Sequence, residues 1–194
     1  MREMFRLFIV VAIFSAVAGL ALAAVQTWTA EKIETQELKY VKGPTLIRIF
    51  EGCSNDPLND RFKLIDNEKE INFFVGAFDG NRNSVAFETA GKGFGGDIGV
   101  LVAVNLETEE IVGIGVTTHG ETPGLGSRTK DDPAFSAQFK GTSINDPFNV
   151  KADGGSVDAV TGATISSRGV CSAITEASEM FSRLKDDIKQ NLNG

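Results

Sequence analysis

A glycine-containing turn rich in hydroxyl groups precedes the last helical segment of the sequence. Residues 158–164 read DAVTGAT, and ISSR follows at 165–168. A helix N-terminus presents unpaired N–H groups and a partial positive charge, which together favour a phosphate. Gly162 lets the backbone approach a ligand closely, and Thr164 places a hydroxyl where a phosphoryl group could settle or be attached. An ordinary turn and helix cap, without any ligand, accounts for the same residues.

A second shaped loop follows a predicted strand. Residues 118–126 read THGETPGLG, and Pro123-Gly124 suits the central positions of a type II turn. Its glycines allow close approach to a flat ligand, with His119 and Glu121 as polar groups at the rim. A plain tight connection with a hydrogen-bonded histidine is the simpler alternative. A serine hydrolase is disfavoured, because the sequence has no G-x-S-x-G elbow.

The composition excludes several other kinds of site. The chain has 194 residues, a formal charge of −7, one His and two Cys. So few ligands cannot assemble a zinc site or an iron–sulfur cluster alone. An acidic chain is also a poor partner for nucleic acid. We therefore expect no metal and no nucleic acid, and any redox chemistry requires an organic cofactor or ligands supplied by a partner.

The N-terminal segment predicts a membrane anchor. Residues 7–25 are uncharged and mostly apolar, and as a helix they would span about 28 Å, close to the ~30 Å hydrocarbon core. Arg2 and Arg6 precede them, which predicts a cytoplasmic N-terminus. A signal peptide cleaved after Ala23 is the alternative. Both interpretations export the rest of the chain, and we assign residues 1–27 to the anchor and 28–194 to an extracytoplasmic domain.

The remaining pattern predicts a single α+β domain with a small, mainly antiparallel sheet packed against helices. A short helix is expected from Thr29 to Tyr40, and a loop between Gly52 and Asp60. Asp132-Pro133 resembles a helix start that places Phe135 and Phe139 on one face. Runs of β-branched and aromatic residues predict strands at 72–78, 84–89, 98–105, 111–118 and 148–151.

The C-terminal segment has the clearest helical periodicity. Apolar residues recur at alternating spacings of four and three, which is typical of an amphipathic helix: Val170, Ile174, Ala177, Phe181, Leu184 and Ile188. Ser166 or Ser167 would cap its start. Cys171 lies on this helix. The sequence allows it to be either a buried free thiol or the partner of Cys53 in a disulfide.

Taken together, the two motifs resemble those of a known family. DAVTGAT at 158–164 resembles the signature recognised by periplasmic flavin transferases. HGETPGLG at 119–126 is similar to a loop of the FMN-binding domain shared by the G subunit of the Rnf complex and the C subunit of the sodium-pumping NADH:quinone oxidoreductase. GFGGDI at 93–98 resembles the segment before that domain's sheet. The resemblance covers about residues 1–190, and the short chain fits the Rnf protein better.

The resemblance implies a covalent flavoprotein. In this family FMN is joined through its phosphate to the last threonine of the motif, here Thr164, by a transferase that recognises a motif including Asp158 and Gly162. The flavin then carries single electrons within a membrane complex. In the Rnf complex, electrons pass between ferredoxin and NAD, coupled to sodium or proton movement. The chain would be a redox subunit with other membrane and redox subunits as partners, and no nicotinamide-binding fingerprint occurs in the sequence.

The expected cofactor contacts therefore come from both motifs. Besides Thr164, we expect them from Asp158, Thr161, Gly162, Ala163, Glu121, Thr122, Gly124 and Leu125. The loop would pack near the isoalloxazine, with Leu125 and Gly124 as apolar contacts. The alternatives are the C subunit of the quinone reductase, a membrane-anchored flavin redox sensor, and an anchored protein that binds an anionic ligand at the 161–164 turn.

Overall fold

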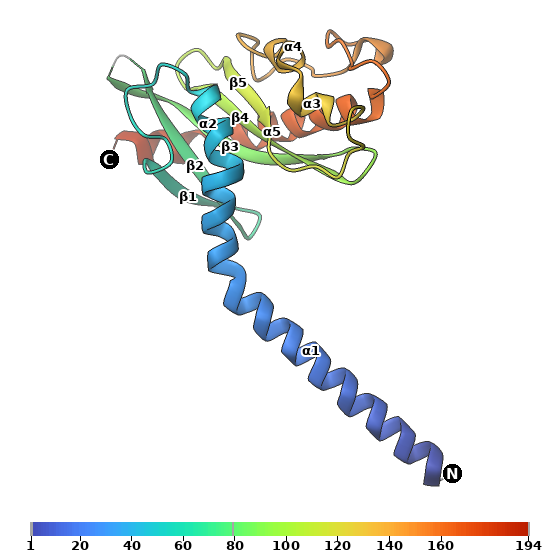
Figure 1. The fold of residues 1–194 in the computed structure, drawn as a ribbon. Coiled ribbons are helices and arrows are strands. Elements are labelled where there is room, and N and C mark those ends of the chain that lie inside the picture. The colour runs from blue at the N-terminus through green and yellow to red at the C-terminus, as the bar shows by residue number, and fades with distance from the viewer. Residues whose placement is uncertain (1, 79, 194) are drawn as a thin grey trace. The chain divides into compact units, whose positions relative to one another are not determined.

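The computed structural model describes residues 2–78 and 80–193, which form two compact units, Met1–Tyr40 and Val41–Gly194. The first unit is dominated by one helix, α1 (Arg2–Glu37) (Figure 1). The predicted apolar helix and the predicted polar helix from Thr29 as far as Glu37 are thus parts of one continuous element. A π-helical segment, Leu38–Lys42, follows it. No proline occurs in α1, so no missing N–H interrupts its hydrogen-bond ladder.

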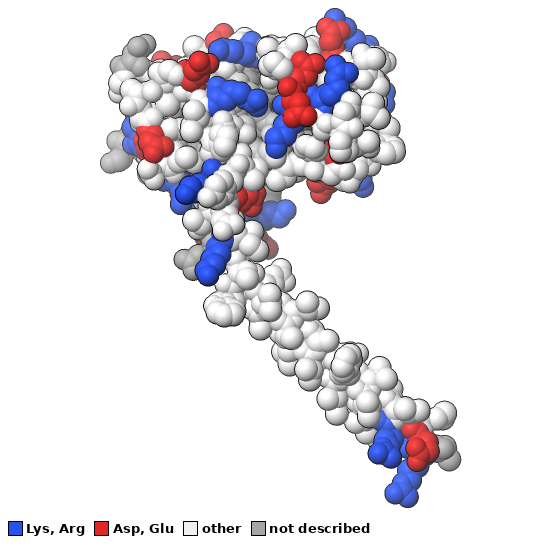
Figure 2. All heavy atoms as spheres, viewed as in Figure 1, with Lys and Arg blue, Asp and Glu red and all other residues white. Residues whose placement is uncertain are grey.

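The N-terminal part of α1 has the properties of a membrane-spanning helix. Residues Arg2–Ala30 are long and apolar enough to cross a bilayer, with a mean hydropathy of 2.7. Charged side chains gather at the N-terminal end of the helix, and an uncharged stretch follows (Figure 2). This segment fits a single-pass membrane protein.

The second unit is built on a five-stranded antiparallel sheet in which neighbouring strands follow one another along the chain. The strands are β1 (Arg61–Asp66), β2 (Lys69–Phe78), β3 (Asn81–Lys92), β4 (Asp97–Asn105) and β5 (Ile111–Val116). The predicted α+β class is confirmed. The strands predicted from residue 72 to residue 118 are all present, and most are longer than expected.

Two strand predictions differ from the structure. β1 was not predicted, because three of the six residues of RFKLID are charged and Leu64 and Ile65 break the alternation of a half-buried strand, and this edge strand has no fully buried side chain. Conversely, residues 148–151 are not a strand. Val150 makes a single parallel bridge to Val157, and a 3₁₀ turn, η2 (Lys151–Asp153), follows at once.

Helix α5 (Thr164–Asn193) covers one face of the sheet, packing mainly on β3 and β4 (Figure 1). All six residues of its predicted apolar face are buried, which confirms that prediction. The other face is covered by α2 (Gly43–Ile49), which lies against β5. Gly115 makes room for it, because a Cβ there would lie 2.2 Å from Cγ2 of Thr45.

Two short helices, α3 (Arg128–Asp131) and α4 (Pro133–Ala137), follow the loop after β5. Asp132 caps α4 as expected, since its carboxylate accepts a hydrogen bond from the Ala134 N–H at 3.0 Å. The rings of Phe135 and Phe139 pack edge to face with their centroids 5.7 Å apart. Both are buried, as their four-residue spacing predicted.

Candidate functional site

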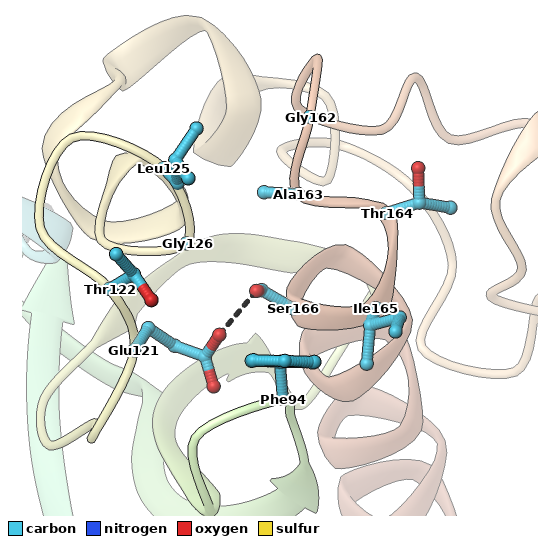
Figure 3. A pocket seen from close by; sticks show the side chains of 10 residues that line it. All are labelled: Phe94, Glu121, Thr122, Leu125, Gly126, Gly162, Ala163, Thr164, Ile165 and Ser166. Carbon is cyan, nitrogen blue, oxygen red and sulfur yellow. Dashed lines mark hydrogen bonds between the residues drawn. The ribbon is translucent and has the colours of Figure 1, made fainter.

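Three segments that are distant in the sequence enclose a cavity of about 410 Å³ (Figure 3). They are the turn between β3 and β4, the loop after β5, and the turn that enters α5. The volume lies within the range typical of small-molecule sites. The lining residues are Phe94, Glu121, Thr122, Leu125, Gly126, Gly162, Ala163, Thr164, Ile165 and Ser166.

Glycines hold the start of α5 close to the β3–β4 hairpin. A Cβ at Gly91 would lie 1.9 Å from the carbonyl oxygen of Gly169, so only glycine permits this approach. A Cβ on Gly169 would in turn lie 2.9 Å from the carbonyl oxygen of Lys92. The first turns of α5 therefore lie against the end of β3, which brings the hairpin turn to the cavity.

The turn before α5 orients its first residue. Gly162 has a φ of +79°, a conformation that favours glycine, and the helix begins two residues later at Thr164. Thr164 is partly exposed in the cavity wall. The N–H of Ser167 donates to the carbonyl of Ala163 at 2.9 Å, but the N–H groups before it at the helix start have no intrahelical carbonyl partner, and the macrodipole adds partial positive charge. This end of the cavity suits a phosphate.

The predicted caps of α5 were wrong, because the helix begins earlier than Ser166 or Ser167. Both serines lie inside its first turn and are bound elsewhere. The Ser167 hydroxyl donates to the carbonyl of Ala163 at 3.0 Å and accepts from the N–H of Val160 at 3.0 Å. The Ser166 hydroxyl instead points across the cavity to the loop after β5 (Figure 3).

Glu121 is a buried carboxylate at the junction of all three segments. Its Oε2 accepts a hydrogen bond from Ser166 Oγ at 2.5 Å, and its Oε1 accepts one from the N–H of Gly95 at 2.8 Å. Burial raises the pKa of this carboxyl, but hydrogen bonds from Ser166 and the backbone of Gly95 and Phe94 outweigh burial and hold the pKa below its ordinary value. Glu121 is therefore an anion at neutral pH.

The loop after β5 contains the expected turn. The N–H of Leu125 donates to the carbonyl of Thr122 at 3.2 Å, and Gly124 has the positive φ, +75°, that a type II turn requires at this position. The turn leaves Leu125 beside the cavity. Gly126 is packed so tightly that a Cβ there would lie 2.5 Å from Glu121 Oε2.

Large apolar side chains are exposed around this cavity. Phe94 is 72% exposed, Leu125 50% and Ile165 47%, and each lines it. Exposed apolar groups gathered at one concavity indicate a surface that a ligand covers. The cavity thus combines an apolar wall with an end that suits a phosphate, a combination that fits the ring and phosphate of FMN.

The structure brings together six of the nine residues predicted to contact the cofactor. Glu121, Thr122 and Leu125 share the cavity with Gly162, Ala163 and Thr164. Gly124 is not among the lining residues. Neither is His119, whose Nδ1 accepts a hydrogen bond from the Glu121 N–H at 3.3 Å.

Asp158 and Thr161 line a neighbouring cavity of about 320 Å³ instead. The Gln138 side chain makes two hydrogen bonds to the Asp158 backbone. Its Oε1 accepts one from the Asp158 N–H at 2.7 Å, and its Nε2 donates one to the Asp158 carbonyl at 3.1 Å. The Asp158 carboxylate is exposed and paired with Lys151 at 2.7 Å. These two residues therefore stand outside the cavity that holds Thr164.

Four lining residues were not predicted as cofactor contacts: Phe94, Gly126, Ile165 and Ser166. Phe94 belongs to the GFGGDI segment, whose family resemblance was the available signal. Ile165 follows Thr164 directly, so its exposure at the helix start could not be deduced from the apolar periodicity farther along.

Among the residues that the structure describes, the cysteines and acidic side chains form no further site of this kind. Cys53 and Cys171 are both free thiols, and burial raises the pKa of Cys171 to about 11. Within residues 2–78 and 80–193, no group of three or more His, Cys, Asp or Glu side chains could hold a metal ion.

Comparisons with known proteins agree with this geometry. Residues 93–179 match the model of the FMN-binding domain family, a span that includes the three cavity-forming segments. The structure is similar to the C subunit of the Na⁺-translocating NADH-quinone reductase from Parabacteroides distasonis, with a TM-score of 0.51 and 27% identity over 61% of this chain and 64% of that one. It is also similar to NqrC from Shewanella oneidensis, with a TM-score of 0.52 and 28% identity over 72% of each chain.

The sequence relatives share more of the chain. The G subunit of the ion-translocating oxidoreductase complex of Cereibacter sphaeroides is 33% identical over 91% of this chain and 83% of its own length. The corresponding G subunit of Pseudomonas aeruginosa is 30% identical over 93% of this chain and 89% of its own. The predicted resemblance is confirmed: the chain belongs to the family of G subunits of ion-translocating oxidoreductase complexes.

Proposed function

We propose that this chain is the electron-transfer subunit of an ion-translocating oxidoreductase complex and carries FMN attached covalently to Thr164 through a phosphodiester. The flavin supplies the electron-carrying chemistry, and the protein supplies binding, orientation and electrostatics. It is a redox subunit rather than a complete enzyme. The other membrane and redox subunits of the complex are its partners, and a flavin transferase is its partner during maturation.

One observation carries the proposal: Thr164, the first residue of α5, shares a cavity with the exposed apolar side chains of Phe94, Leu125 and Ile165. A phosphodiester at Thr164 retains one negative charge, which the start of a 30-residue helix stabilises. A ring tethered there lies within reach of the apolar wall. The tether also retains a small cofactor that an extracytoplasmic compartment could not readily replace.

The topology is part of the proposal. We assign residues 1–27 to a retained, single-pass inner-membrane anchor with a cytoplasmic N-terminus, and residues 28–194 to the FMN domain on the extracytoplasmic side. Arg2 and Arg6 before the apolar stretch support this orientation. The mass of the mature chain distinguishes a retained anchor from a signal peptide cleaved after Ala23.

In-gel flavin fluorescence of the full chain, co-expressed with a flavin transferase, tests the covalent bond. We expect the wild type to stay fluorescent after denaturation and Thr164→Val to lose the signal. Thr175→Val is the matched control, because Thr175 lies farther along α5, outside the 158–164 motif, and lines a different cavity, so it should keep the fluorescence. A wild type without fluorescence, or a fluorescent Thr164→Val, would contradict the proposal.

A further inference from the structure

Glu121 is the single ionisable side chain among the described residues that line the main cavity. The others are apolar, hydroxyl-bearing or glycine, and no lysine or arginine is among them. Only 6% of Glu121 is exposed. Its negative charge therefore acts on the cavity with little screening by solvent, since buried charges interact through a low effective dielectric.

The hydrogen bonds around Glu121 fix this charge in place. Ser166 Oγ from α5 and the Gly95 N–H from the β3–β4 turn bind different oxygens of the carboxylate, at 2.5 and 2.8 Å. Two packed segments thus each bind one oxygen of the group, and Gly126 lies against it, since a Cβ there would lie 2.5 Å from Oε2. Such an arrangement keeps a carboxylate ionised and oriented, and the nearby His119 also lowers the pKa of Glu121.

We propose that the carboxylate of Glu121 lowers the reduction potential of FMN bound in this cavity. The inference rests on the proposed function, because it requires the flavin to lie against the Glu121 wall. Adding an electron beside a fixed, buried anion costs more free energy than adding it beside a neutral group. Glu121 itself is neither oxidised nor reduced. Its charge changes the energy of the reduced cofactor.

Redox titration of the flavin-loaded full chain tests this, with dithionite as the reductant and absorbance as the readout. Glu121→Gln keeps the size of the side chain and removes its charge. We expect the one-electron equilibrium of its flavin to shift about tenfold toward the reduced form, which corresponds to a rise of about 59 mV in reduction potential. Glu109→Gln removes a carboxylate that lines a different cavity and should leave the potential unchanged.

Ser166→Ala separates charge from packing. It removes the hydroxyl that partly balances the carboxylate, so at a pH that keeps Glu121 ionised the potential should fall, opposite in sign to Glu121→Gln. Loosened packing alone would move both variants in the same direction, which would overturn the inference. An unchanged or lower potential in Glu121→Gln would also overturn it. If Glu121→Gln carries no flavin, Ser166→Ala is the test, and an unchanged or higher potential there would overturn the inference. A wild type without flavin would instead refute the proposed function itself.

Discussion

The hydroxyl of Ser166 donates a hydrogen bond to the carboxylate of Glu121 across 45 residues of sequence, at 2.5 Å. This bond joins the two segments that carry the family resemblance, the loop after β5 and the start of α5. Both residues are buried. The cavity is thus closed at its base by an interaction between the motifs, with the apolar side chains arranged around it (Figure 3).

Acid should weaken this junction. The pKa of Glu121 is held below its ordinary value of 4.5, so its ionisation stabilises the fold above that pH, and the stabilisation is lost as pH falls through the lower folded value. At pH 7, Glu121→Gln should reduce the free energy of unfolding by roughly 1.5–3 kcal/mol, the range for hydrogen bonds to charged groups. The wild type and the variant should then converge below pH 4.5.

Urea unfolding of the full chain in detergent, at several pH values, measures this convergence. Asp153→Asn is a useful comparison, because the pKa of Asp153 is also lowered, by its hydrogen bonds from Arg168, but on the protein surface. Surface ion pairs contribute little to stability, so this variant should change less at pH 7. A stability difference for Glu121→Gln that stays constant from pH 7 to pH 3 would exclude the ionised carboxylate as its cause.

The contact between β3 and α5 should tolerate no side chain. Gly91→Ala would place its Cβ 1.9 Å from the Gly169 carbonyl oxygen and 2.7 Å from the Ala173 nitrogen, both backbone atoms of α5. The helix must move to relieve this clash, and overpacking of this kind costs roughly 1–3 kcal/mol. We expect a lower thermal midpoint and a smaller fraction of chains with attached flavin, because the same shift displaces Thr164.

Gly113→Ala is the matched control on β5. A Cβ there would meet side-chain and backbone atoms of Ile49 at 3.4 Å or more, which is ordinary contact. Its thermal midpoint should stay close to that of the wild type. Equal losses in the two variants would show that any alanine in this sheet is harmful and that the Gly91–Gly169 approach has no special importance.

The two cysteines should differ in reactivity. Cys171 is buried, and its pKa is raised to about 11, so little reactive thiolate exists at neutral pH. Cys53 is partly exposed. Iodoacetamide should add one group to the native chain and two after denaturation, as read by intact mass. Failure of the denatured, unreduced chain to take up two groups would indicate a disulfide instead.

The sequence predicted the sheet well where burial follows a simple rule. β4 and β5 are dense in β-branched residues, and such residues favour the pleated, buried positions of a sheet. β1 escaped prediction because Arg61, Lys63 and Asp66 make its sequence resemble a polar connection. The helical periodicity from Val170 to Ile188 was sufficient for α5, although not for its first residue.

The site was harder to predict, because its walls meet only in the folded chain. Ser166 was expected to cap α5, but its hydroxyl binds Glu121, a tertiary partner that local pattern cannot reveal. Phe94 reaches the cavity only because Gly91 and Gly169 let α5 approach the hairpin. Asp158 and Thr161 are close to Thr164 in sequence, yet the turn at Gly162 separates them from its cavity.

Tryptic peptide mass mapping of the natively matured chain tests the covalent flavin most directly. Cleavage after Lys151 and Arg168 releases residues 152–168, which contain both Thr161 and Thr164. We predict a peptide heavier by one FMN less one water, with fragmentation assigning the added mass to Thr164. An unmodified peptide, or an FMN group on Thr161, would contradict this assignment.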